Sequence, residues 1–367
     1  MEILFSNPIW DNPRPQLHAK NSSFPYLCEL EDGSILATHQ MGEAFESVDG
    51  TASISRSTDG GRTWGEPWSL GKKDYPFPVS DCAKITLLPD GRLIAFGYGF
   101  IRDDPEQAIA NPDNGGVLDD IVFFSISDDK GITWSDRQEI ACTWGRHVEA
   151  PAPITVLQNG SWVTPITGFP NWEAEMTSRM CGRLLRSDDQ GKTWNDDVVC
   201  MEFPGDSITC YEQRLCQLSD GTTIIIAWNE DTINEKTLNN HYTISRDNGR
   251  TFSKPFDTGI NGQTPFVCHL SGSSMFSLHT MRKDTDEPGI YGYLVDFSNG
   301  AWNITEEAIL WQPQSKLITA NDTTAAIFAY LKFGMPGAVK LKDGTLLMAH
   351  WLAEEGQYKT IATGIAL

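Results

Sequence analysis

The stretch "SRSTDGGRTWGEP" (residues 55–67) decides the fold, because close copies of it recur along the chain. Each copy has the pattern Ser-x-Asp-x-Gly-x-Thr, followed by Trp or Phe. The copies begin at Ser57, Ser127, Ser187 and Ser245, in steps of 70, 60 and 58 residues. Short polar side chains can bond the backbone of such a turn, and glycine supplies a positive φ. Since catalysis does not need four copies, we interpret these aspartates as turn-forming residues.

A second motif runs out of phase with the first. It places Asp-Gly, Asn-Gly or Ser-Gly between apolar, alternating segments, which is a strong signal for a β-hairpin. Six copies begin, in chain order, at Leu30, Leu88, Leu157, Leu218, Leu270 and Leu341. A repeat of about 60 residues that carries two hairpins predicts a four-stranded antiparallel sheet, and six such sheets fill the chain.

Sheets of this kind bury their faces against one another, and radial closure is the stable arrangement. The sequence therefore predicts an all-β, six-bladed β-propeller. The last repeat ends at Leu367 without a fourth strand, and the N-terminal "EILFSNPIW" (residues 2–10) can supply that strand and close the ring. No segment resembles a linker, so we expect residues 1–367 to form a single domain.

The chain is strongly acidic, with a formal net charge of −21. This charge argues against nucleic acid or an anionic membrane as a partner, because phosphate groups would be repelled. The N-terminus lacks the basic region and apolar core of a signal peptide, and no window is long enough to cross a bilayer. Eight cysteines are scattered without C-x-x-C spacing. We expect a cytoplasmic protein with reduced thiols and with no metal or cofactor; an inter-blade disulfide is the alternative.

The repeated turns match the Asp-box motif (the bacterial neuraminidase repeat), and the whole chain resembles the sialidase-like six-bladed propellers. The resemblance implies that the Asp-box turns join the third and fourth strands of a blade, on the face away from the catalytic cleft. It also implies that substrate lies over the central well, beside the innermost strands. A sialidase carries an arginine triad and a nucleophilic tyrosine in this well. Two arginine positions fall on Ser23 and Trp228 here, and the tyrosine falls near Met335, which argues against sialic acid as the substrate.

Two glutamates remain as candidates for catalysis. Glu212 matches the glutamate of the sialidase-like pattern in the innermost strand of blade four, and Glu149 lies in the equivalent segment of blade three. Glycoside hydrolysis requires two carboxyl groups across a cleft, one to protonate the leaving oxygen and one to act as nucleophile or base. The pair resembles that of the exo-arabinanase branch of the superfamily. We predict an exo-acting glycoside hydrolase that removes a terminal sugar from an oligosaccharide.

The same well should hold the residues that bind the sugar. We expect these to be Arg146, His147, Asp81, Lys84, Arg214 and Tyr330. All but Lys84 have a structural alternative: Arg214 as a partner of Glu212, Arg146 and His147 as part of a solvated loop, Asp81 as a turn residue, and Tyr330 as a core residue. The insertion 102–120 should overhang the well as a lid or rim.

Two other functions fit the same fold. A polysaccharide lyase would use His147 or Tyr330 as the base and Arg146 or Lys84 to neutralise a uronate. A non-catalytic propeller would bind carbohydrate or protein without turnover.

Overall fold

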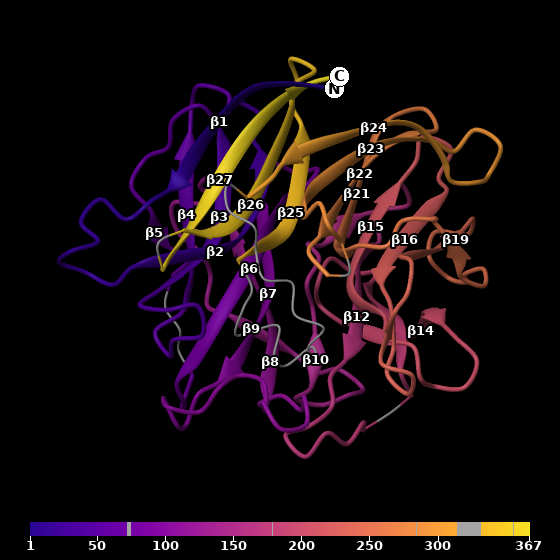
Figure 1. Cartoon of the computed structure of the whole chain (residues 1–367), viewed down its shortest axis with the longest axis horizontal. Helices are drawn as coiled ribbons and strands as arrows, with labels where there is room; N and C mark the ends of the chain where they lie inside the picture. The colour runs from indigo at the N-terminus through magenta and orange to yellow at the C-terminus, as the bar shows by residue number, and fades with distance from the viewer. Residues whose placement is uncertain (72–74, 178, 284, 314–331, 355) are drawn as a thin grey trace.

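The computed structural model describes residues 1–71, 75–177, 179–283, 285–313, 332–354 and 356–367. These residues form strands, turns and loops, and the described part of the chain contains no helix that could span a membrane. The strands form six small antiparallel sheets that follow one another around a ring (Figure 1). The prediction of an all-β, six-bladed propeller is confirmed.

The first three blades are built from consecutive strands, innermost strand first. Blade one contains β2 (Asn21–Glu29), β3 (Ile35–Gly42), β4 (Thr51–Ser57) and β5 (Trp68–Ser69). Blade two contains β6 (Val79–Leu87), β7 (Leu93–Ile101), β8 (Asp120–Ser127) and β9 (Gln138–Ile140). In blade three the innermost strand is split, and the strands are β10 (Val148–Glu149), β11 (Thr155–Val156), β12 (Trp162–Gly168), β13 (Cys181–Ser187) and β14 (Asn195–Glu202).

The last three blades follow the same plan. Blade four contains β15 (Tyr211–Gln217), β16 (Thr223–Trp228), β19 (His241–Ser245) and β20 (Phe256–Asp257), with a small hairpin of β17 (Glu230–Asp231) and β18 (Lys236–Thr237) beside it. Blade five contains β21 (Gln263–Ser271), β22 (Ser274–Met281), β23 (Gly289–Asp296) and β24 (Asn303–Trp311). Blade six contains β25 (Phe333–Lys340), β26 (Leu346–Glu354), β27 (Gln357–Ala366) and, from the other end of the chain, β1 (Glu2–Trp10).

The two ends of the chain close the ring. Strand β1 pairs antiparallel with β27, and the termini lie side by side (Figure 1). The hydroxyl groups of Ser6 and Thr363 lie 3.0 Å apart across this pair, and Ile9 is buried. The N-terminal segment therefore supplies the missing outer strand of blade six, as predicted.

The repeated turns join the third and fourth strands of blades one to four, and each closes on itself in the same way. In blade one, Oγ of Ser57 accepts from the backbone N–H of Gly61 at 2.9 Å and donates to Asp59 at 2.8 Å. The other Asp59 oxygen accepts from the Thr63 hydroxyl at 2.6 Å. The same bonds recur in blades two, three and four. The aspartates are thus occupied by their own turns.

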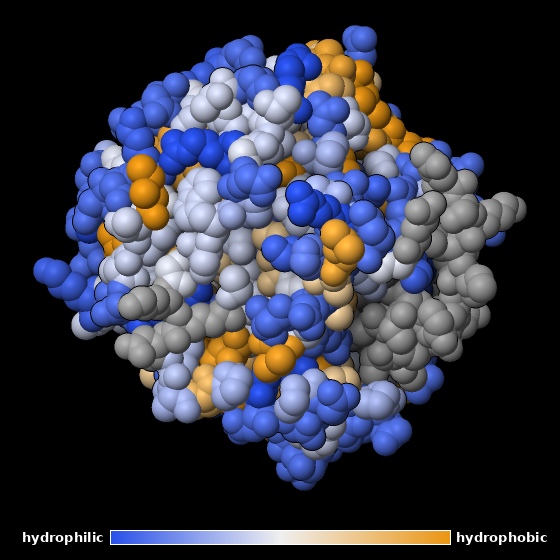
Figure 2. Space-filling model, turned by 90° about the vertical axis from the view of Figure 1, so that its left-hand side faces the viewer, coloured by the Kyte–Doolittle hydropathy of each residue, from blue (hydrophilic) through white to orange (hydrophobic). Residues whose placement is uncertain are grey.

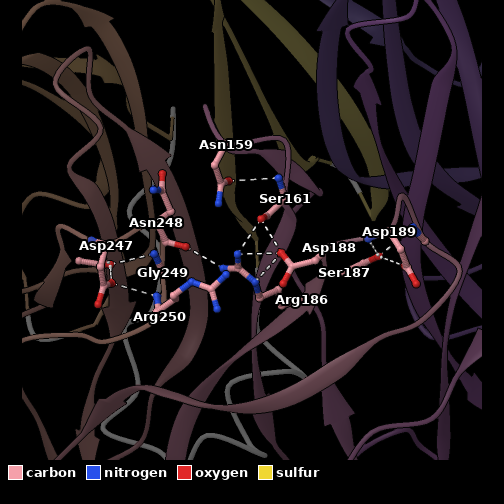
Figure 3. A network of polar contacts seen from close by, with 12 residues as sticks. Asn159, Ser161, Arg186, Ser187, Asp188, Asp189, Asp247, Asn248, Gly249 and Arg250 are labelled. Atoms are coloured by element: carbon pink, nitrogen blue, oxygen red, sulfur yellow. Dashed lines mark hydrogen bonds and ion pairs between the residues drawn. The ribbon is translucent and has the colours of Figure 1, made fainter.

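The aromatic residue that ends each turn packs between neighbouring blades. Trp64 joins a cluster formed by blades six and one, Trp134 joins one formed by blades one and two, and Trp194 and Phe252 repeat the arrangement. Figure 3 shows a polar link of the same kind, in which Arg186 of blade three donates to the backbone oxygen of Asn248 in the turn of blade four at 2.7 Å. The turns therefore fix each blade against the next.

The surface agrees with the acidic composition. Hydrophilic side chains cover most of the face in Figure 2, with small hydrophobic groups among them.

All eight cysteines are free thiols, six of them buried. The expectation of reduced thiols is confirmed, and the alternative of an inter-blade disulfide is not.

Candidate active site

The innermost strands of four blades share an irregularity at the end where the chain enters them. The register shifts there, and one residue that is not glycine adopts a left-handed conformation: Phe24, Glu212, Thr264 and Met335, with φ between 47° and 54°. Such conformations cost free energy and often mark functional sites. Because the conformation recurs at an aromatic residue, a threonine and a methionine, we attribute it to the fold rather than to catalysis at Glu212.

The innermost strand of blade three is interrupted just after Glu149. Pro151 and Pro153 lie between β10 and β11, and proline cannot donate to a strand ladder, so pairing stops there. The carboxylate of Asp120 accepts a hydrogen bond from the backbone N–H of Val148 at 2.8 Å. The residue before Glu149 is thereby fixed to blade two. The insertion 102–120 thus ends in a buried strand residue that positions the site, a role that the sequence did not predict.

Glu149 and Glu212 meet between blades three and four. Oε2 of Glu149 accepts a hydrogen bond from the backbone N–H of Glu212 at 2.8 Å. Glu149 is only 5% exposed, while Glu212 is half-buried and its Oε2 has no hydrogen-bond partner among the described residues. Folding therefore brings the Glu149 carboxyl group against the backbone of Glu212, although 63 positions separate the two residues in the sequence.

Two cations lie in one layer of the central channel beside this pair. Lys84 in β6 and Arg214 in β15 each stand three residues before the end of their strand, so they occupy the same register position in blades two and four. Both are buried and within electrostatic reach of Glu149 and Glu212. Arg214 is held by the backbone oxygens of Glu212 and Gln213, at 3.2 and 2.9 Å.

Burial raises the pKa of both glutamates, but the charges around them differ. Burial, and then the charge of Glu212, raise the pKa of Glu149 to about 8. Burial also raises the pKa of Glu212, but Arg282, Arg214 and Lys84 oppose that rise. The surroundings thus favour the protonated form of Glu149, while the three cations act in favour of the ionised form of Glu212.

Arg282 was not predicted, and it completes the cationic surroundings of Glu212. It follows β22 in blade five, where its Nη1 donates to the backbone oxygen of Phe333 at 3.0 Å and its Nε is buried without a partner among the described residues. Its guanidinium lies 5.9 Å from the centre of the Trp228 ring. The sequence feature that could have indicated Arg282 is the charged run that begins with it, directly after a predicted hairpin strand. The sequence gave no reason to connect blade five with Glu212.

Arg146 and His147 lie on the segment that leads into β10. Arg146 is partly exposed, pairs with Glu139 at 3.1 Å and stacks over Phe77. The His147 ring lies 3.6 Å from Asp119. The cations that act on the glutamate pair are instead Lys84, Arg214 and Arg282.

Asp81 is engaged on the other face of β6, against blade one. One of its oxygens accepts from the backbone N–H of Ala52 at 2.8 Å, and the other forms an ion pair with Arg137. Its exposed fraction is 0%. We therefore give Asp81 a role in joining blades one and two instead of the expected contact with a sugar. Tyr330, also expected in the well, lies outside the described residues.

A cavity of about 350 Å³ occupies the channel on the far side of Arg214. Its lining comes from the innermost strands of five blades and includes Tyr26, Pro153, Arg214, Cys216, Phe266 and Lys340. Tyr26 and Phe266 occupy the register position of Arg214 in their own blades, so this layer separates the glutamate pair from the cavity. Among the described residues, no group of three or more acidic, histidine or cysteine side chains could hold a metal ion.

Aromatic rings border the glutamate pair on the side of blades two to four. Tyr211, the residue before Glu212, lies 6.0 Å from Phe169 and 6.2 Å from Trp228, measured between ring centres. Phe169 and Tyr211 are half-buried. Such surfaces suit the apolar faces of sugars. Trp144 and Trp351 are fully buried.

Comparison with solved structures supports the fold over the whole chain. A protein of unknown function from Dyadobacter fermentans superposes with a TM-score of 0.75 at 15% identity, covering 99% of this chain and 98% of that one. A Hadza microbial sialidase superposes at 0.70 and 14%, covering 98% and 68%. The Penicillium chrysogenum α-L-arabinanase superposes at 0.68 and 14%, covering 100% and 98%. No protein-family model and no curated protein sequence matches the chain. The fold is that of the sialidase-like propellers.

Proposed function

We propose that this chain, built on the sialidase-like propeller fold, is an exo-acting glycoside hydrolase that uses Glu149 and Glu212 as its catalytic pair. The observation that carries the proposal is the hydrogen bond between Oε2 of Glu149 and the backbone N–H of Glu212. This contact, and the effect of the Glu212 charge on Glu149, support the proposal that the two carboxyl groups serve one substrate site. Glycoside hydrolysis requires two carboxyl groups that flank the scissile bond.

Glu149 is suited to the part of general acid. Burial raises its pKa to about 8, so it holds a proton at neutral pH. One oxygen accepts the hydrogen bond of the Glu212 N–H, which leaves the second oxygen outside that contact. That second oxygen can carry the proton and give it to the glycosidic oxygen as the bond to the anomeric carbon breaks.

Glu212 is suited to the part of nucleophile or base. Lys84, Arg214 and Arg282 favour its ionised form, and its Oε2 makes no hydrogen bond with described residues. The carboxylate can attack the anomeric carbon, after which water releases the sugar, or it can take a proton from the attacking water. A positive charge that develops on the sugar ring would be stabilised by the same carboxylate.

The experiment is to screen aryl glycosides and short oligosaccharides with the wild type, Glu149→Gln and Glu212→Gln. We expect turnover of at least one terminal sugar by the wild type and a loss of about 10²-fold or more in each variant. NMR of the first product would show whether configuration is retained, as for a nucleophile, or inverted, as for a base.

Arg92→Met is the matched control, because Arg92 is partly exposed and pairs with Asp90, two residues away in the sequence. It should keep wild-type activity. Turnover that persists unchanged in both glutamine variants would exclude the pair, and no turnover of any substrate would favour a carbohydrate-binding protein.

A further inference from the structure

The cavity on the far side of Arg214 has a lining of one sign of charge. Its volume of about 350 Å³ is within the usual range of small-molecule sites. The chain carries 49 aspartates and glutamates, yet none of them is among the described residues that line the cavity. Arg214 and Lys340 are both in the lining. The cavity therefore favours an anion over a cation.

Arg214 lines this cavity with part of its guanidinium group unused. The residue is only 3% exposed, and its Nη1 donates to the backbone oxygens of Glu212 and Gln213. A guanidinium has five N–H donors, and those on Nε and Nη2 of Arg214 make no hydrogen bond to a described residue. Unlike the Nε of Arg282, these nitrogens are not completely buried. They are therefore available to a group that enters the cavity.

Tyr26 offers a second donor beside Arg214. It lines the cavity at the same register position in blade one, within electrostatic reach of Arg214. Its hydroxyl makes no hydrogen bond to a described residue and is not completely buried. Gly337 holds this register position in blade six, and a Cβ atom there would lie 3.5 Å from the Tyr26 ring and 3.8 Å from the Phe266 ring. The two rings thus converge on a glycine, and a guanidinium and a phenol hydroxyl lie in one layer.

The rest of the lining is apolar or already hydrogen-bonded. The apolar part includes Pro153, Phe266, Val267, Ala338 and Val339. At the exposed end of the cavity, Lys340 donates to the Leu270 backbone oxygen at 3.0 Å, and the His269 ring bonds the Gly272 backbone oxygen at 3.1 Å. The unused donors therefore lie at the inner end, and apolar side chains lie between them and the opening.

We propose that this cavity binds a small organic acid, with its carboxylate on Arg214 and Tyr26 and its apolar body against Phe266 and the aliphatic side chains. Arginine suits a carboxylate because its N–H groups can donate to both oxygens. The layer that contains Arg214 separates this site from the glutamate pair. The inference therefore concerns a second site and does not depend on hydrolysis.

The test is titration calorimetry with the full chain and three acids of different shape: benzoate, 2-naphthoate and hexanoate. The amide of each acid keeps the apolar body without the charge, and acetate keeps the charge without the body. We expect at least one of the three acids to bind about 10- to 100-fold more tightly than its own amide and than acetate.

Four variants locate the ligand. Arg214→Met should abolish the preference for acid over amide, and Tyr26→Phe should weaken binding of the acid by about 2- to 10-fold. Cys268→Leu keeps both donors but puts a larger side chain into the lining, so it should weaken binding of the acid and of its amide alike. Lys340→Met is the matched control, because it removes a cation from the exposed end of the same cavity. It should leave the preference intact.

Equal binding of acids and amides, or no binding of any of the three acids, would overturn the inference. A preference that survives Arg214→Met, or that Lys340→Met removes, would do the same. Unchanged binding in Cys268→Leu would place the ligand outside the cavity. Circular dichroism checks that each variant is folded, and if Arg214→Met is not, Tyr26→Phe and Cys268→Leu decide. None of these measurements involves turnover, so their outcome is independent of the proposed hydrolase.

Discussion

Oε2 of Glu149 lies 2.8 Å from the backbone nitrogen of Glu212 and accepts its hydrogen bond. The contact joins blade three to blade four at the mouth of the channel, and it fixes one carboxyl group by means of the backbone of the other residue. An amide oxygen could accept the same bond. Glu149→Gln should therefore preserve the geometry while it removes the proton donor.

The first prediction concerns the leaving group. If Glu149 is the acid, Glu149→Gln should lower kcat/KM by about 10²- to 10⁴-fold for substrates with poor leaving groups. Aryl glycosides of acidic phenols need little protonation and should lose far less. Glu212→Gln should hydrolyse both kinds of substrate slowly. Equal losses for good and poor leaving groups in Glu149→Gln would contradict the assignment.

The pH dependence of activity gives a second prediction. Because the pKa of Glu149 is raised to about 8, kcat/KM of the wild type should fall as pH rises through 8, where the acid loses its proton. Glu149→Gln cannot lose that proton, so its residual activity should show no alkaline limb there. Initial rates from pH 5 to 9.5 would test this, and an identical limb in the variant would assign it to another group.

The raised pKa of Glu149 also leads to a third prediction, which concerns stability. Between about pH 4.5 and pH 8 the native state holds a proton on Glu149 that the unfolded chain has released. The free energy of unfolding should therefore decrease as pH rises through this range and level off above it. Urea unfolding at several pH values should give a shallower dependence for Glu149→Gln than for the wild type. Parallel curves would show that Glu149 is ionised in the native protein.

A fourth prediction tests the link between blades three and four. Arg186 is 3% exposed and donates to the Ser161 hydroxyl at 2.6 Å, to Asp188 at 2.9 Å and to Asn248 at 2.7 Å (Figure 3). Arg186→Met should lower the free energy of unfolding by about 2–4 kcal/mol, because buried acceptors lose a charged donor. Arg92→Met removes an exposed ion pair and should cost less than about 1 kcal/mol. Equal effects would show that the link adds no stability.

The fifth prediction concerns ring closure. Deleting residues 1–10 removes β1, uncovers the edge of β27 and exposes the core around Ile9. We expect the unfolding midpoint to fall by more than about 10 °C. Deleting only Leu367, which is 52% exposed, should leave it unchanged. An unchanged unfolding midpoint in the protein that lacks residues 1–10 would mean that the open ring is stable without β1.

The sequence by itself determined the architecture. The repeated turns and hairpins are local, since Ser57, Asp59, Gly61 and Thr63 bond one another within seven residues. Contacts between residues so close in the chain can be predicted from the sequence alone. The spacing of the repeats indicated the number of blades and the strand that closes the ring. The spacing also gave the phase of each blade, and the resemblance to sialidase-like propellers then selected Glu149 and Glu212 as candidates.

Only the tertiary structure decided which charges surround that pair. Lys84, Arg214 and Arg282 come from blades two, four and five, and nothing in their local sequence relates them. Asp81 lies three residues before Lys84 on one strand, yet it is bound to blade one. Burial and long-range Coulomb forces depend on which side chains meet in three dimensions, and these forces set the proton affinity of Glu149.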